Sequence, residues 1–211
     1  MDKLEKFTRE SLDFDKRLFF VFLCLFTFVL LLIKKNFIEL EIAAFEVLEQ
    51  DGNLGVFHFI KTLQNFSIPI IYLWKFTIIA FVIWIGCFMF GYKVAYAKVW
   101  QVVMIAESVF FIPEIIKIFY FLFIVTDPNY FEVRAFYPFS IMNLLDYEIT
   151  SKAWHYPLKV LNIFELFYWV LLVYGIKLAS RKRLEISALI VVFSYIFFFF
   201  VWLGFYVIVY K

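Results

Sequence analysis

Five long apolar runs, separated by polar and charged residues, dominate the pattern of this chain. They cover residues 18–33, 68–90, 99–125, 160–179 and 186–210. A helix of about 20 apolar residues crosses the roughly 30 Å hydrocarbon core of a bilayer. The first run is short for a span, but the basic residues beside it can snorkel to the interface. The pattern predicts an all-α polytopic membrane bundle with five transmembrane helices, forming a single integral membrane domain over residues 1–211.

The segments outside these runs show helical patterns of their own. The N-terminal segment predicts an amphipathic helix with Leu4, Phe7, Ser11 and Phe14 on one face. Residues 37–66 predict two amphipathic helices around a turn at 51–55, where two glycines supply turn conformations. We expect this hairpin to cap the spans on the outer membrane surface, with packing across the bundle as the alternative.

The loop between the third and fourth runs opens with a turn signal at Asp127, Pro128 and Asn129. It then predicts a short helix near residues 140–147 and a break at Pro157.

The distribution of lysine and arginine predicts the orientation of the chain. With the N-terminus inside, the inner segments hold eleven of these residues and the outer segments hold seven. The positive-inside rule favours this arrangement, and the short basic turn at residues 180–183 is its sharpest signal. We therefore expect a cytoplasmic N-terminus and a C-terminus outside.

Composition agrees with this interpretation. The chain is 65% hydrophobic, whereas soluble domains are about 45–50% apolar. The net charge is only +2 and no basic tract indicates nucleic-acid binding. Cys24 and Cys87 both fall inside predicted spans, so we expect small apolar packing residues rather than a disulfide or a metal pair.

Ionisable residues inside the apolar runs are the candidate functional residues, because charges in a membrane are costly and mark a function or a buried pair. They form a predicted intramembrane charge cluster of Lys75, Glu107, Glu114, Lys117 and Glu165. At a rise of about 1.5 Å per residue, all except Glu107 fall in one band of the outer half of the bilayer.

Two interpretations of this cluster stay open. The first is a charge-neutral polar core in which Lys117 contacts Glu114 or Glu165, and Lys75 joins them or snorkels outward. The second is an ion or proton relay. Glu107 has no obvious partner in register, so it could face the cytoplasmic side or a partner subunit.

Pro113 lies in the middle of the third run. Proline removes one backbone donor and crowds the carbonyl four residues earlier. The sequence therefore predicts a helix kink or local unwinding over residues 109–113.

Catalytic motifs are missing from the sequence. It contains no HExxH, no GxSxG, no paired-cysteine metal spacing and no glycine-rich phosphate loop. His58 and His155 stand alone, without a second ligand at metal spacing. We expect a protein that is not an enzyme, with no catalytic residues, cofactor or metal.

The second half of the chain resembles a known family. The stretch GYKVAYAKVWQVVMIAESVFFIPEIIKIFYFLF at 91–123 has a glycine, a lysine, an aromatic residue and then an apolar helix with a proline in its middle. The last two runs reach Gly175, turn through basic residues and re-enter as a final span. This order resembles the Yip family of Rab/Ypt-interacting membrane proteins over roughly residues 68–210.

The resemblance implies five spans with an inner N-terminus and an outer C-terminus. The chain lacks the long N-terminal region and the acidic-leucine-glycine-proline motif of eukaryotic members, so the bacterial branch fits better and a Rab-type GTPase is not an expected partner. The resemblance to that branch implies an integral protein of the bacterial cytoplasmic membrane. The expected partners are the lipid bilayer and other membrane proteins. Two function classes follow from the sequence as a whole: a non-catalytic subunit or scaffold of a membrane complex, and alternatively a small transporter or ion-conducting component.

Overall fold

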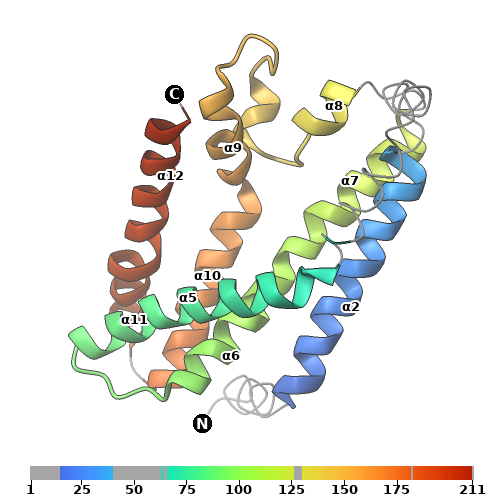
Figure 1. The fold of residues 1–211 in the computed structure, drawn as a ribbon. Helices are drawn as coiled ribbons and strands as arrows, with labels where there is room; N and C mark the ends of the chain where they lie inside the picture. The colour runs from blue at the N-terminus through green and yellow to red at the C-terminus, as the bar shows by residue number, and fades with distance from the viewer. Residues whose placement is uncertain (1–14, 40–62, 64–65, 126–129, 182, 211) are drawn as a thin grey trace. The chain divides into compact units, whose positions relative to one another are not determined.

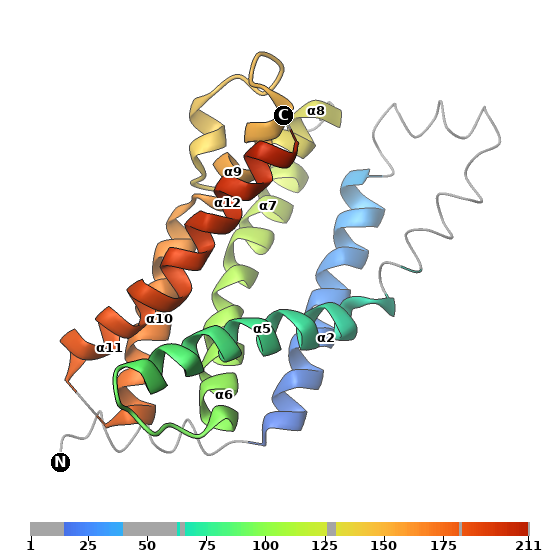
Figure 2. The same cartoon turned by 60° about the vertical axis from the view of Figure 1, so that its left-hand side comes forward.

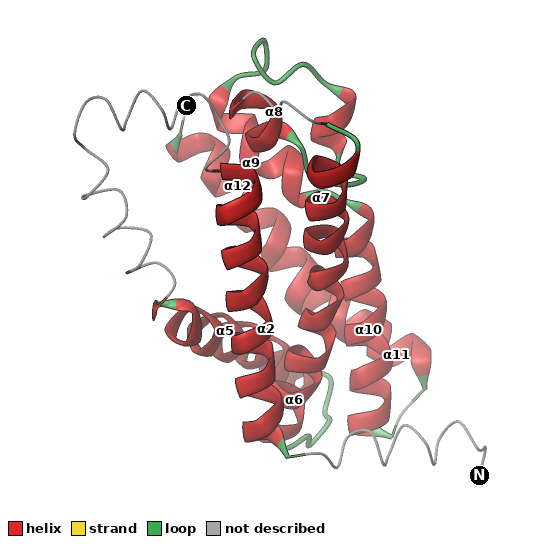
Figure 3. Cartoon of the chain, turned by 90° about the vertical axis from the view of Figure 1, so that its right-hand side faces the viewer, coloured by secondary structure: helices red, strands yellow, loops and turns green. Residues whose placement is uncertain are grey.

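The computed structural model describes residues 15–39, 63, 66–125, 130–181 and 183–210. Within these residues the chain is helical, and the only β-type pairing is an isolated bridge between Ser140 and Asn162 (Figure 3). The predicted all-α class is confirmed for this part of the chain. The predicted N-terminal amphipathic helix and most of the hairpin at 37–66 lie outside the described residues.

Four described helices are long and apolar enough to cross a membrane. The first is α2 (Lys16–Lys34), which continues into the π-helical turn η1 (Lys35–Glu39). The second is α5 (Ile68–Met89) and the third is α10 (Ile163–Ser180). The last runs from Leu184 to Val209 and consists of α11 (Leu184–Val191), the π-helical turn η4 (Val192–Ile196) and α12 (Phe197–Val209).

The apolar run at 99–125 is not one uniform helix. It forms α6 (Tyr96–Glu107), the 3₁₀ turn η2 (Ser108–Phe110) and α7 (Phe111–Phe123). The 3₁₀ turn ends three positions before Pro113 and overlaps the stretch 109–113, where proline predicts irregular backbone. Each α-helical part is too short to cross the hydrocarbon core alone, so the five-span count stays a prediction.

The connection from α7 to α10 holds the short helix α8 (Tyr130–Ala135), the 3₁₀ turn η3 (Ile141–Leu144) and α9 (Lys152–Val160). The predicted break at Pro157 is wrong, because Pro157 lies inside α9 and the helix continues to Val160. In so short a helix, proline removes a single backbone hydrogen bond.

The chain divides into two compact units that alternate along the sequence. Unit 1 comprises Met1–Phe22, Leu73–Val109 and Phe164–Lys211, and unit 2 comprises Leu23–Tyr72 and Phe110–Ile163. The division runs through α2 and α5, so these units are not successive domains. The single domain over residues 1–211 stays a prediction.

Close backbone approach holds the helices of unit 1 together. A Cβ on Gly175 of α10 would lie 2.2 Å from Cγ1 of Val102 on α6, and one on Gly86 of α5 would lie 2.8 Å from Cβ of Ser194. Both glycines therefore admit a neighbouring helix that any side chain would exclude. The part of α5 in this unit crosses α6 and α10 rather than running alongside them (Figures 1 and 2).

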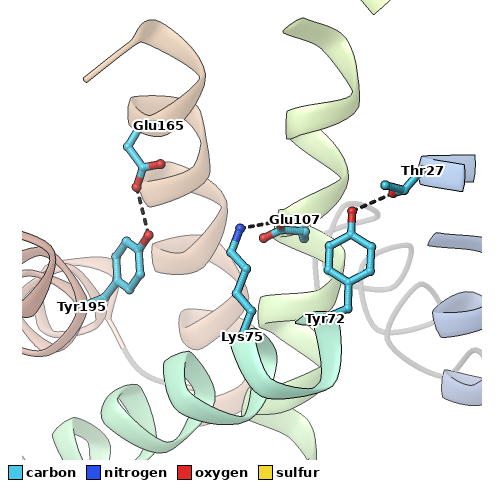
Figure 4. Close-up of polar contacts among 6 residues, drawn as sticks. All are labelled: Thr27, Tyr72, Lys75, Glu107, Glu165 and Tyr195. Carbon is cyan, nitrogen blue, oxygen red and sulfur yellow. Dashed lines mark hydrogen bonds and ion pairs between the residues drawn. The ribbon is translucent and has the colours of Figure 1, made fainter. Parts of the chain in front are cut away.

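Unit 2 has its own apolar core. Leu30, Ile118, Phe121 and Val133 are buried together, with Phe26 and Phe136 packed against them. The ring of Phe26 lies 4.6 Å from that of Phe111, between centroids, and Tyr120 stacks on Phe136 at 4.2 Å. The hydroxyls of Thr27 and Tyr72 are hydrogen-bonded at 2.7 Å (Figure 4).

Candidate functional site

Unit 1 buries several polar side chains among membrane-type helices, and this makes it the candidate site. Its buried polar residues are Gln101, Glu107, Glu165, Ser187 and Ser194. Buried charges are costly unless they are paired and hydrogen-bonded. The partners of the two carboxylates therefore show what the arrangement can do.

Glu107 forms an ion pair with Lys75. The Nζ of Lys75 lies 2.5 Å from Oε1 of Glu107, from α5 to α6 (Figure 4). The side chain of Glu107 is 5% exposed and that of Lys75 is 41% exposed. The expectation that Glu107 has no obvious partner is therefore wrong. Estimating depth at a fixed rise per residue assumes parallel helices, and it fails here because α5 crosses α6.

Glu165 is bound by aromatic side chains. Trp169, one turn later on α10, donates its Nε1–H to Oε1 of Glu165 at 2.8 Å. The hydroxyl of Tyr195 donates to the same oxygen at 2.9 Å (Figure 4). The charges of Lys75 and Glu107 also act on this carboxylate, the first by attraction and the second by repulsion. Lys75, Glu107 and Glu165 thus belong to one electrostatic group.

The π-helical turn η4 positions Tyr195 for this contact. Such turns insert an extra residue into a helix and occur frequently at functional sites. Next to Tyr195, Ser194 donates its hydroxyl to the carbonyl of Ile190 at 2.6 Å, inside the same helical segment. The ring of Tyr168, which is fully buried, packs edge-on against Tyr195 at 5.4 Å between centroids.

One carboxylate oxygen in this group stands apart. Atom Oε2 of Glu107 is buried and has no hydrogen-bond partner among the described residues. Buried polar atoms are nearly always satisfied, so an exception in a membrane-type helix marks a place to look for function.

The other two predicted charges belong to unit 2. Atom Oε2 of Glu114 lies 3.6 Å from Nζ of Lys34. The sequence predicted Lys117 as the cation beside Glu114, and this ion pair is with Lys34. The Nζ of Lys117 donates to the carbonyl oxygens of Val133 at 2.6 Å and of Phe136 at 2.8 Å. The five predicted residues are therefore distributed over both units, with Lys75, Glu107 and Glu165 in unit 1.

Sequence reasoning missed the aromatic partners. Trp169 and Tyr195 look like ordinary residues of apolar helices, where aromatic side chains are frequent. The available signal was the Glu165-to-Trp169 spacing of four residues, which places both side chains on one helix face. Tyr195 lies 30 residues away from Glu165, and no local pattern connects them. Cys24 and Cys87 are free thiols.

Comparison with protein-family models, curated proteins and solved structures finds no match for this chain. The resemblance to the Yip family therefore stays a prediction from the sequence, and the functional argument rests on the contacts described above.

Proposed function

We propose that the chain is a non-catalytic integral membrane protein that acts as a subunit or scaffold of a larger membrane complex. The observation that carries this proposal is that the two buried carboxylates among the described residues of unit 1 are bound by the chain's own side chains. Glu107 pairs with Lys75, and Glu165 accepts hydrogen bonds from Trp169 and Tyr195. Groups engaged in this way hold helices together and leave a carboxylate less available for a substrate.

The outer surface of unit 1 supports the same proposal. The last membrane-type helix exposes many large apolar side chains, among them Phe193, Phe197, Phe198, Val201, Trp202 and Phe205. Lipid chains and other membrane helices are both suitable neighbours for such a surface. The proposal includes five spans, an inner N-terminus and an outer C-terminus in the bacterial cytoplasmic membrane, as the basic residues and the Yip-like pattern predict.

A second candidate function is a small transporter or an ion- or proton-conducting component. Atom Oε2 of Glu107 favours this function, because a buried acceptor without a hydrogen bond can take up a proton or a cation. Glu165, in the same electrostatic group, would be the next carboxylate along such a path.

Replacing Glu165 by glutamine distinguishes the two candidates. As a scaffold, Glu165→Gln lowers thermal stability in detergent and leaves the set of co-purifying membrane proteins unchanged. As a conductor, the same variant stays folded and loses ion or proton flux that wild-type protein shows in liposomes containing a pH-sensitive dye. Tyr174→Phe on the same helix is the matched control, because the exposed Tyr174 lies outside the polar group.

Flux through wild-type liposomes that disappears in Glu165→Gln but not in Tyr174→Phe would refute the scaffold proposal. Absence of flux in all three proteins, together with reduced stability of Glu165→Gln, is the result that the scaffold proposal predicts.

A further inference from the structure

Large apolar side chains are exposed in the segment that connects η3 to α9, outside the membrane-type helices. Leu144 is 83% exposed and Ile149 is 84% exposed, and Leu145 and Trp154 are exposed as well. All four lie within residues 144–154, which belong to unit 2. Exposed apolar side chains that gather in one place mark a contact with a membrane or with another protein.

This segment is folded, and its fold determines which apolar side chains stay outside. Met142 of η3 and Ala153 of α9 are buried, and η3 packs against α9. The ring of His155 on α9 stacks on that of Tyr147 at 3.9 Å between centroids, which fastens the loop to the helix. The same packing leaves the larger side chains of residues 144 and 149 uncovered.

Polar side chains of the segment bind its own backbone. The Nε2–H of His155 donates to the carbonyl oxygens of Tyr147 at 3.0 Å and of Thr150 at 2.9 Å. The carbonyl of Asp146 accepts hydrogen bonds from the backbone N–H of Thr150 at 3.0 Å and from its hydroxyl at 2.5 Å. The carboxylate of Asp146 accepts the backbone N–H of Glu148 at 2.9 Å. Because backbone groups without partners are costly in lipid, these contacts make it easier for the loop to leave water.

The position of the segment matches the surface of a membrane. Within unit 2, α9 and the loop before it lie at the same end as the C-terminal end of α2, a membrane-type helix (Figures 1 and 2). Along the chain, α9 ends at Val160 and the membrane-type helix α10 begins at Ile163. Tryptophan, which is exposed here at Trp154, is enriched where a membrane meets water. The exposed charged residues Asp146 and Glu148 suit the depth of the headgroups rather than the hydrocarbon core.

We propose that residues 144–154 form an interfacial membrane anchor, which lies among the lipid headgroups and inserts Leu144, Ile149 and Trp154 toward the acyl chains. Insertion removes these apolar side chains from water, and this is the driving force. Lipid is the expected neighbour because the segment is continuous with membrane-type helices and binds its own backbone groups. The inference rests on the membrane location in the proposed function and does not depend on the scaffold role.

Nitroxide spin labels on the full chain in phosphatidylcholine liposomes measure the depth of the anchor. Leu144→Cys and Ile149→Cys are labelled singly, in a background with Cys24 and Cys87 replaced by alanine. Substitutions at such exposed positions change stability little, so both variants should fold. Collisions of the label with oxygen, which concentrates in the bilayer, are compared with collisions with a water-soluble nickel chelate. We expect both labels about 5–10 Å inside the headgroup boundary, shielded from the chelate and accessible to oxygen.

Two reference labels separate failure of the anchor from failure of the membrane location. Phe198→Cys, at an exposed position of α12, should report the hydrocarbon core, and Lys93→Cys, in the exposed turn between α5 and α6, should report water. If the labels at 144 and 149 meet the chelate as freely as the label at 93, while the label at 198 is shielded, the anchor is overturned and the membrane location stands. Shielding of both loop labels from oxygen as well would show a protein contact and also overturn the anchor. Free access of the chelate to the label at 198 would overturn both.

Discussion

The ammonium nitrogen of Lys75 lies 2.5 Å from Oε1 of Glu107, although the two residues are 32 positions apart on helices that cross. The exposure of the two partners is unequal, at 41% for the lysine side chain and 5% for the glutamate. Lysine without its partner can turn toward the surface, whereas glutamate without its partner stays buried. The pair should therefore contribute to stability mainly because removal of Lys75 leaves the carboxylate of Glu107 buried without a cation.

Replacing Lys75 by methionine should destabilise the protein. Lys75→Met leaves a buried carboxylate without its cation, and we expect the free energy of unfolding to fall by about 1–3 kcal/mol, between the values for exposed and buried pairs. Thermal unfolding in detergent measures the change. Lys98→Met removes an exposed lysine of α6 and should stay within about 0.5 kcal/mol of wild type. Equal stability of the two variants would contradict a stabilising role for the pair.

Replacing Gly175 by alanine should separate α6 from α10. The added Cβ would lie 2.2 Å from Cγ1 of Val102, a β-branched side chain that cannot easily move away. We expect a loss of roughly 1–3 kcal/mol, as for other overpacked contacts. Gly204→Ala is the control, because no atom lies within 4 Å of the Cβ it would add.

A second substitution that removes the methyl groups in contact with the added Cβ tests whether the steric clash is the cause. Val102→Ala combined with Gly175→Ala should recover part of the lost stability, since the contacting methyl groups are gone. If the double variant is as unstable as the sum of the two single variants predicts, the close approach of these helices is not the cause.

The sequence predicted the helical class and five spans, and four of these correspond to membrane-type helices among the described residues. Long apolar runs leave few other solutions in a membrane. The run at 99–125 shows where length and hydropathy are insufficient. The 3₁₀ turn at Ser108–Phe110 interrupts that run, and only Pro113 pointed to it. Hydropathy reports an average over a window and does not report the path of the backbone.

Partners within the candidate site could be predicted less well. Sequence selected Glu107 and Glu165 as candidate residues because charges in apolar runs are conspicuous. It did not predict their partners. Glu107 pairs with Lys75 because α5 crosses α6, and Glu165 accepts a hydrogen bond from Tyr195 because a π-helical turn places that hydroxyl beside it. Crossing directions and register come from contacts such as Gly175 with Val102, which no local pattern contains.

Stability should increase with pH above about 8 through Lys159. Burial and the charges of Arg134 and Lys34 lower the pKa of Lys159 to about 8 in the folded protein, against 10.5 for an ordinary lysine, so between these values the unfolded chain binds more protons. Unfolding therefore becomes less favourable as pH rises through this window, and the effect is absent below it. Melting temperatures of wild type and Lys159→Gln in neutral detergent measure it.

The comparison with Lys159→Gln isolates this residue from other groups that titrate at high pH. We expect the stability of wild type relative to the variant to increase from pH 7 to pH 10. A constant difference, or one that moves in the variant's favour, would show that burial and the neighbouring charges of Arg134 and Lys34 do not act on Lys159 as described.

Cysteine labelling tests the predicted five-span topology. Single cysteines at Ser180 and at Lys211, in a background with Cys24 and Cys87 replaced by alanine, are treated with a membrane-impermeant reagent in intact cells. With five spans, only the cysteine at 211 reacts, because the basic turn at 180–183 is inside. Reaction of both positions, or of neither, would contradict this topology.

The proposed scaffold function is tested most directly by the composition of the particle that the chain forms in its own membrane. Affinity-tagged protein, extracted in a mild detergent and weighed by native mass spectrometry, should appear with at least one other membrane protein in a fixed stoichiometry. That stoichiometry should be the same for Glu165→Gln protein that remains folded. A particle containing only copies of this chain, which conducts ions or protons after reconstitution, would contradict the account.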